Sequence, residues 1–112
     1  MVSSHEVYEA KIEMEKKLIK NIIDTAKKHG IIRESLAAKA NIKYPTFLKI
    51  CSYDIRYLGT TNSRLRIADL LDALIELLRD KQIEADGDIA YIQKLQTEFD
   101  KSDFDADNCS EN

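Results

Sequence analysis

The sequence predicts an all-α protein, a compact bundle of about five helices with a long first helix. Two observations lead to this prediction. Glycine occurs 3 times and proline once in 112 residues, so few positions interrupt a helix. Hydrophobic residues make up 44% of the chain and recur at the three- and four-residue steps of helices that bury one face. That fraction and this length suit one hydrophobic core, and therefore one domain.

The first helix is expected over residues 4–29. Ser3 and Glu6 have the spacing of a capping box, in which the two side chains satisfy backbone N–H groups at the helix start. Residues 27–29, KKH, place cations at the C-terminal end of the helix, where the helix dipole is negative. Gly30 then favours the left-handed conformation that ends a helix. The side that faces the core is formed by Tyr8, Ile12, Ile19, Ile22, Ile23 and Ala26.

A tight turn separates two short helices in the middle of the chain. The first of them is expected over residues 33–40. Asn41 tolerates the left-handed conformation better than most residues, and Pro45 suits the first position of a helix because it has no N–H to leave unpaired. The second short helix therefore covers residues 45–52, with Phe47 and Ile50 facing inward. Polar and basic side chains are left to face outward.

The C-terminal half predicts two further helices. Residues 63–85 are strongly apolar, and their hydrophobic positions cover more than the ~100° stripe that one core face needs. This helix is therefore buried on two sides within one subunit, or its surplus face meets a second subunit. Residues 86–88, DGD, break it, and a last helix is expected over residues 89–99. The domain then spans residues 1–99, with 63–99 as possible dimerisation helices, and residues 100–112 form an acidic disordered tail.

The net charge of −3 hides a segregation of charge along the chain. Residues 30–66 carry seven basic against two acidic residues, whereas residues 67–112 carry four basic against thirteen acidic ones. A difference in charge this large between two segments says more about possible partners than the net charge of the whole chain does. The basic segment contains the tight turn, and its local charge favours DNA as a partner.

The residues Leu36-Ala37, Ala40, Asn41-Ile42, Phe47 and Ile50 form a spaced pattern, and the leucine-rich "RLRIADLLDAL" follows it. In this pattern the chain resembles the helix-turn-helix domain of the Cro/Xre phage-repressor-like DNA-binding proteins. The resemblance covers residues 17–78 and implies that helix 45–52 enters the major groove of DNA. The family usually has glycine where Asn41 stands and a Ser or Thr cap where Lys43-Tyr44 stands.

The resemblance and the basic segment together predict a sequence-specific transcriptional regulator, repressor-like and cytoplasmic, that binds double-stranded DNA. Lysines and arginines are expected to contact phosphates or a guanine edge, and hydroxyls to donate to phosphate or base edges. Thr46 and Ser52 could instead bond the backbone locally, Tyr44 could cover the turn as a hydrophobic lid, and any one cation could be a solvated surface charge. The predicted DNA-binding residues are Arg33, Lys43, Tyr44, Thr46, Lys49, Ser52, Arg56 and Arg64, and Arg66 extends the same basic surface.

A homodimer is expected, because one small subunit contacts less DNA than the ~1,000–2,500 Å² of protein surface that specific complexes bury. Two-fold pairing places two such helices one turn of DNA apart. The acidic C-terminal third is expected to be a solubilising tail, or alternatively to fold over the basic segment or to bind a partner protein. The predicted dimerisation residues are Leu74, Leu78, Ile92, Leu95 and Phe99.

Catalysis, cofactors and metal ions have little support in the sequence, and no enzyme activity is expected. His5 and His29 lie at expected helix ends without a Ser or Cys at a catalytic spacing. The segment DFDADN, residues 103–108, begins like a calcium loop but lacks its glycine and its final glutamate. No apolar run approaches the ~18 residues of a membrane span, and Cys51 and Cys109 suit a reduced cytosol.

The alternative function comes from another class of protein. A protein-binding adaptor or inhibitor, such as a phage or mobile-element protein or an antitoxin, could keep the helix-turn-helix scaffold without reading DNA. The overall acidity and the unusual turn residue favour this alternative, whereas the local basic charge favours DNA.

Overall fold

Five α-helices and one short 3-10 helix make up the described part of the computed structural model, which gives the backbone of residues 4–81 and 86–111 and the side chains of 7–81 and 87–101. In chain order the elements are α1 (Ser4–Lys28), α2 (Arg33–Lys39), α3 (Tyr44–Cys51), η1 (Ile55–Tyr57), α4 (Thr61–Asp80) and α5 (Asp86–Glu111). The all-α prediction is confirmed. Gly30 ends α1 at a φ of 71°, as predicted. Ser3 lies outside the described residues, so the capping box before α1 stays a prediction.

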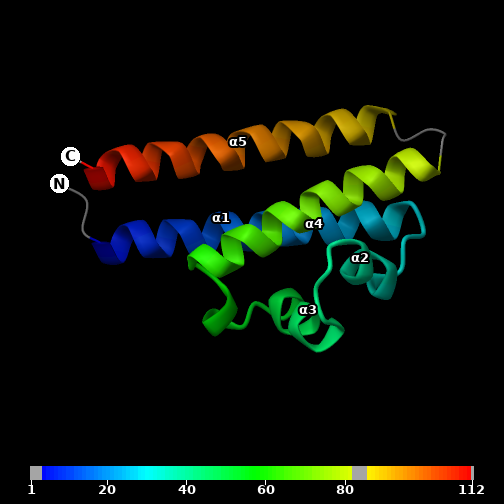
Figure 1. Cartoon of the computed structure of the whole chain (residues 1–112), viewed down its shortest axis with the longest axis horizontal. Helices are drawn as coiled ribbons and strands as arrows, with labels where there is room; N and C mark the ends of the chain where they lie inside the picture. Colours follow the sequence, from blue (N-terminus) through cyan, green and yellow to red (C-terminus); the bar gives the residue numbers. More distant parts are fainter. Residues whose placement is uncertain (1–3, 82–85, 112) are drawn as a thin grey trace.

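Helix α4 occupies the middle of the bundle. It packs against α1, α2 and α5, while α3 packs against α1 and α2. Figure 1 shows α5 on one side of the α1–α4 pair and the short helices α2 and α3 on the other. This arrangement holds α3 at the edge of the molecule, with one side against the core and one side in solvent.

The surplus apolar face of α4 is covered by α5 of the same chain. Leu74, Leu78 and Ile92 are 0% exposed and Phe99 is 2% exposed, while Leu95 packs half-buried against the same core. The five predicted dimerisation residues therefore form the core of one subunit, and their assignment to a dimer interface was wrong. The physical reason is that α5 supplies the apolar stripe that α4 needs on its second side.

The turn between α2 and α3 has the predicted geometry. Asn41 adopts a φ of 58°, and the N–H of Ile42 donates to the Ala37 carbonyl at 2.9 Å, which closes the end of α2. Ala37 is 1% exposed, because a neighbouring helix approaches it closely. Asparagine thus supplies the left-handed residue that closes this turn.

Helix α3 begins one residue earlier than predicted, at Tyr44, with Pro45 in its first turn. Lys43 precedes it without a side-chain cap bond, as the absence of Ser or Thr at this position implies. Phe47 and Ile50 are almost fully buried, so the predicted inward side of α3 is confirmed. The helix is therefore oriented by its core contacts, which fix the side that remains in solvent.

The end of α3 leads into η1, in a segment that the sequence predicted only as a loop. Tyr53 adopts a φ of 61°, and the N–H of Asp54 donates to the Lys49 carbonyl at 3.1 Å. The Asp54 carboxylate then accepts the backbone N–H of Arg56 at 3.0 Å and caps η1. The chain thereby turns back towards α4.

Helix α4 begins two residues earlier than predicted, at Thr61. The cause is a reciprocal capping box, in which Thr60 and Ser63 each accept the other's backbone N–H. The helix ends at Asp80, short of the predicted end at residue 85. Residues 82–85 lie outside the described residues.

Helix α5 begins at Asp86, so the predicted break over residues 86–88 was wrong. These residues form its first turn, where acidic residues favour the positive end of the helix dipole. The helix continues to Glu111, through a segment that was predicted to be disordered, and this prediction is corrected for the backbone of residues 100–111. No glycine or proline follows Gly87, so no residue beyond it breaks a helix.

An ion-pair cluster joins the end of α1 to the start of α5. The Asp88 carboxylate lies 2.6 Å from His29 Nε2 and 3.0 Å from Lys28 Nζ. The hydrogen bond from His29, followed by that from Lys28, lowers the pKa of Asp88 below its usual value. His29, at the end of α1, therefore has a structural partner in Asp88.

A buried carboxylate fixes the segment between α3 and α4. Glu15 of α1 is 2% exposed, and its Oε1 accepts the N–H of Gly59 at 2.7 Å and lies 2.9 Å from the Ser63 hydroxyl. Gly59 has a φ of 72°, and a Cβ there would lie 2.7 Å from the Tyr8 ring, so only glycine fits. Burial raises the pKa of Glu15. Helix α1 thereby positions the chain that carries η1.

Replacing Glu15 with alanine is expected to lower the free energy of unfolding by about 1–3 kcal/mol, because the Gly59 N–H loses its buried acceptor. Glu15→Gln keeps an oxygen acceptor without the buried charge, so at pH 7 it is expected to be at least as stable as the wild type. As the pH falls through the raised pKa of Glu15, the wild type takes up a proton and gains stability relative to Glu15→Gln. Urea denaturation at several pH values measures this. An alanine variant as stable as the wild type would contradict the structural role.

Candidate nucleic-acid interface

Helix α3 and its C-cap residue present four exposed side chains in solvent: Pro45, Leu48, Lys49 and the C-cap residue Ser52. They are spaced three and four residues apart, as neighbours on one side of a helix are. We call these four residues the outward face of α3. Two of them are apolar and two are polar, so the face is of mixed character.

Three predicted cations are exposed on or next to the two short helices: Arg33 at the start of α2, Lys43 just before α3, and Lys49 near the end of α3. Among the described residues, none of the three forms an ion pair with a carboxylate. Burial raises the pKa of the Cys51 thiol in α3, and the charge of Arg33 opposes that effect, so Arg33 lies close to α3. Arg33 thus lies near α3 in space, whereas Lys43 and Lys49 lie near it through the chain itself.

Tyr44 and Thr46 lie at the margins of the outward face, and both are half-buried. The Tyr44 ring stacks on Phe47 with centroids 6.2 Å apart, which agrees with the alternative of a hydrophobic lid. Burial, followed by the nearby Glu34 carboxylate, raises the pKa of Tyr44. Its hydroxyl therefore keeps its proton and donates a hydrogen bond towards Glu34.

An aromatic ring that the sequence did not single out organises one side of this surface. Tyr57 of η1 is half-buried, with Lys49 Nζ 5.5 Å and Arg66 Cζ 5.6 Å from its ring centroid. Cations are attracted to the negative face of such a ring. Tyr57 therefore holds a lysine of α3 and an arginine of α4 near each other. No signal in the sequence identified it, because η1 itself was not predicted.

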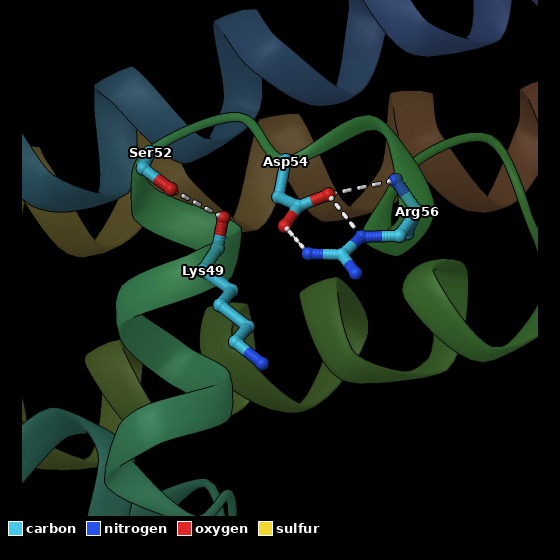
Figure 2. Close-up of polar contacts among 4 residues, drawn as sticks. All are labelled: Lys49, Ser52, Asp54 and Arg56. Carbon is cyan, nitrogen blue, oxygen red and sulfur yellow. Dashed lines mark hydrogen bonds and ion pairs between the residues drawn. The ribbon is translucent and has the colours of Figure 1, made fainter.

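Two predicted DNA contacts are satisfied within the protein instead (Figure 2). The Ser52 hydroxyl donates to the Lys49 carbonyl at 3.0 Å, which is the local bond that was the alternative for this residue. Arg56 donates to the Asp54 carboxylate through Nη2 at 2.7 Å and Nε at 3.1 Å. These bonds lower the pKa of Asp54 to about 2, so the carboxylate stays ionised and offsets the Arg56 charge. Ser52 and Arg56 thus have local partners that compete with DNA, and their roles in DNA binding stay predictions.

Arg64 faces a different part of the molecule. Its guanidinium lies 4.0 Å from the Phe99 ring centroid and donates a hydrogen bond to the Phe99 carbonyl in α5. Figure 1 shows that α5 and α3 lie on opposite sides of the α1–α4 pair. Arg64 therefore contributes to the packing of α5, and its contact with DNA stays a prediction that these bonds do not favour.

Other kinds of site were sought in the same residues. Within the described side chains, no three His, Cys, Asp or Glu residues are grouped to hold a metal ion. No helix of the described part is long and apolar enough to cross a bilayer. The side chains of His5, Cys109 and residues 103–108 lie outside the described residues. No protein-family model, curated protein or solved structure matches the chain.

Proposed function

We propose that this protein is a sequence-specific, repressor-like transcriptional regulator that inserts α3 into the major groove of double-stranded DNA. One observation carries the proposal: α3 is anchored by its buried side, and Arg33, Lys43 and Lys49, on or next to α3, are exposed and form no ion pair with a carboxylate among the described residues. The resemblance of this segment to the Cro/Xre helix-turn-helix supports the same function.

The dimensions of α3 suit this role. With its side chains an α-helix is about 10–12 Å across, and the major groove of B-form DNA is about 12 Å wide, so a short exposed helix such as α3 fits into it. In this arrangement the outward face of α3 meets base edges. Arg33 and Lys43, near the start of α3, contact phosphates, and Lys49 contacts a guanine edge or a phosphate further along the groove.

The net charge of −3 does not oppose DNA binding, because the acidic residues are concentrated on other elements. Eight of the thirteen acidic residues of the segment 67–112 belong to α5. Helix α5 lies across the α1–α4 pair from α3 (Figure 1). This supports a solubilising role for the acidic third over one in which it covers α3.

The proposal includes two copies of the chain on one DNA site. One α3 and three cations contact less DNA than a tight specific complex needs, and a two-fold axis doubles the contact. The pairing surface is not formed by the residues predicted for it, since these lie in the core. Duplexes selected from a random pool are expected to contain inverted repeats with centres one helical turn apart.

Fluorescence anisotropy with a random 24-base-pair duplex at a series of salt concentrations tests the proposal. The logarithm of the association constant is expected to fall with the logarithm of salt concentration at a slope of about −3 per bound subunit, or about −0.9 for each of three cations. Retention on a heparin column is expected for the same reason. Absence of binding, or binding without salt dependence, would falsify the proposal.

The protein-binding adaptor or inhibitor is the second candidate. It is favoured by the apolar residues Pro45 and Leu48 on the outward face of α3, which would suit a groove on another protein, and by the acidic total charge. The salt series separates the two candidates, because an adaptor of net charge −3 has no reason to release counterions from DNA.

A further inference from the structure

The outward face of α3 has few hydrogen-bond donors for base edges. Pro45 has no donor, and the Ser52 hydroxyl is already donated to the Lys49 carbonyl at 3.0 Å. Thr46 is half-buried at the margin. Lys49 is therefore the main side-chain donor that this face can offer to bases, and a helix that reads sequence with one donor needs another kind of contact.

Leu48 provides an apolar contact in the middle of the same helix. Its exposed fraction is 39%, whereas Phe47 and Ile50 beside it in the sequence are 0% and 1% exposed. Leu48 is thus outside the core, on a helix whose orientation the core fixes. Pro45, three residues earlier, adds a second rigid apolar group on the same side.

Leu48 and Lys49 divide the outward face into two sides. Leu48 lies four residues after Tyr44, and therefore on the side of α3 where the Tyr44 ring packs. Lys49 points to the other side, where its amine lies 5.5 Å from the Tyr57 ring centroid. Leu48 therefore offers an apolar contact on one side of the face, and Lys49 a cation on the other.

The major groove offers one apolar group to such a face. Among the four bases only thymine presents a methyl group there, while guanine presents the N7 and O6 acceptors that a lysine binds. We propose that Leu48 reads the methyl group of a thymine in each half-site, with a guanine on the side of Lys49. This inference rests on the proposed function and names the base that the same site recognises.

Replacing thymine with deoxyuridine removes only the methyl group and keeps every hydrogen-bonding group of the base. In a duplex selected from a random pool, each thymine is replaced in turn. The wild-type protein is expected to bind about three- to fivefold more weakly when one contacted thymine is replaced, which is the contribution of one buried methyl group, and about 10- to 25-fold more weakly when the contacted thymines of both half-sites are replaced. Leu48→Ala is expected to bind the thymine and uracil duplexes equally well.

Ser52→Ala is the matched control, because Ser52 lies on the same face with its hydroxyl bonded to the backbone. This variant is expected to keep the preference for thymine. The inference would be overturned, but not the proposed function, if the wild-type protein binds with the expected salt slope and its affinity stays the same at every thymine-to-deoxyuridine replacement. A preference that survives in Leu48→Ala would also overturn it. A protein that binds no duplex at all would overturn both.

Discussion

Phe47→Ala is expected to lower the free energy of unfolding by about 3–5 kcal/mol, the cost of removing a large buried aromatic side chain and leaving a cavity. Phe47 has no exposed surface and supports the stacked Tyr44 ring, so it holds α3 to the rest of the molecule. The free energy of unfolding of a small domain is typically about 5–15 kcal/mol, so this substitution is expected to remove a large part of it. Urea denaturation followed by circular dichroism measures the change.

Leu48→Ala is the matched control for this prediction, because it removes a similar side chain from the next position of the same helix. Leu48 is 39% exposed, so its replacement is expected to change the free energy of unfolding by about 0.5 kcal/mol or less. Equal stabilities for the two variants would mean that the buried and exposed sides of α3 are assigned wrongly.

The triple variant Arg33→Ala, Lys43→Ala, Lys49→Ala is expected to lose most of the electrostatic part of DNA binding. Each phosphate contact contributes about −0.9 to the slope of log affinity against log salt concentration, so the loss of three contacts is expected to make the slope less negative by about 2.7. At 0.1 M salt the affinity is expected to fall on the order of 100-fold or more. All three side chains are exposed, so stability is expected to change little. Anisotropy titrations with the random duplex measure both quantities.

A second triple variant with the same change in net charge serves as the control. Arg79, Lys94 and Lys101 are exposed cations of α4 and α5, away from the outward face of α3. Replacing them with alanine is expected to change the salt slope by a small fraction of the first effect. If both triple variants weaken binding equally, total charge and not the surface around α3 determines the affinity.

The turn and its two helices were predictable because their signals are local. Asn41 favours a left-handed residue and Pro45 a helix start through the chemistry of their own backbone, and both signals hold in the structure. The end of α1 was predictable for the same reason, because Gly30 itself favours the left-handed conformation that ends a helix. The early start of α4 depends on Thr60 and Ser63, and these cap residues were visible in the sequence but were not used to set the helix start.

The errors concern contacts between residues that are distant in the sequence. The excess of apolar residues in α4 requires burial, but the sequence does not say whether α5 of the same chain or a second subunit provides it. Arg64 and Phe99 are 35 residues apart, and their contact follows from that packing. By contrast, the Asp54–Arg56 pair was a local signal, since the two residues are two positions apart within one turn.

Most of the predicted interface residues were identified by charge alone, and charge does not reveal partners. Arg33, Lys43 and Lys49 remain exposed without an ion pair to a carboxylate in the described part of the chain, whereas Arg56 pairs with Asp54 and Arg64 with the ring and carbonyl of Phe99. Which cations find such partners is decided by the folded chain.

A titration of ¹⁵N-labelled protein with a selected duplex, followed by amide chemical shifts, tests most directly whether α3 is the surface that meets DNA. The largest shifts are expected at Arg33 and over residues 43–52, with small changes along α5. Shifts confined to α5, or no shifts at a concentration of DNA well above that of the protein, would contradict the account.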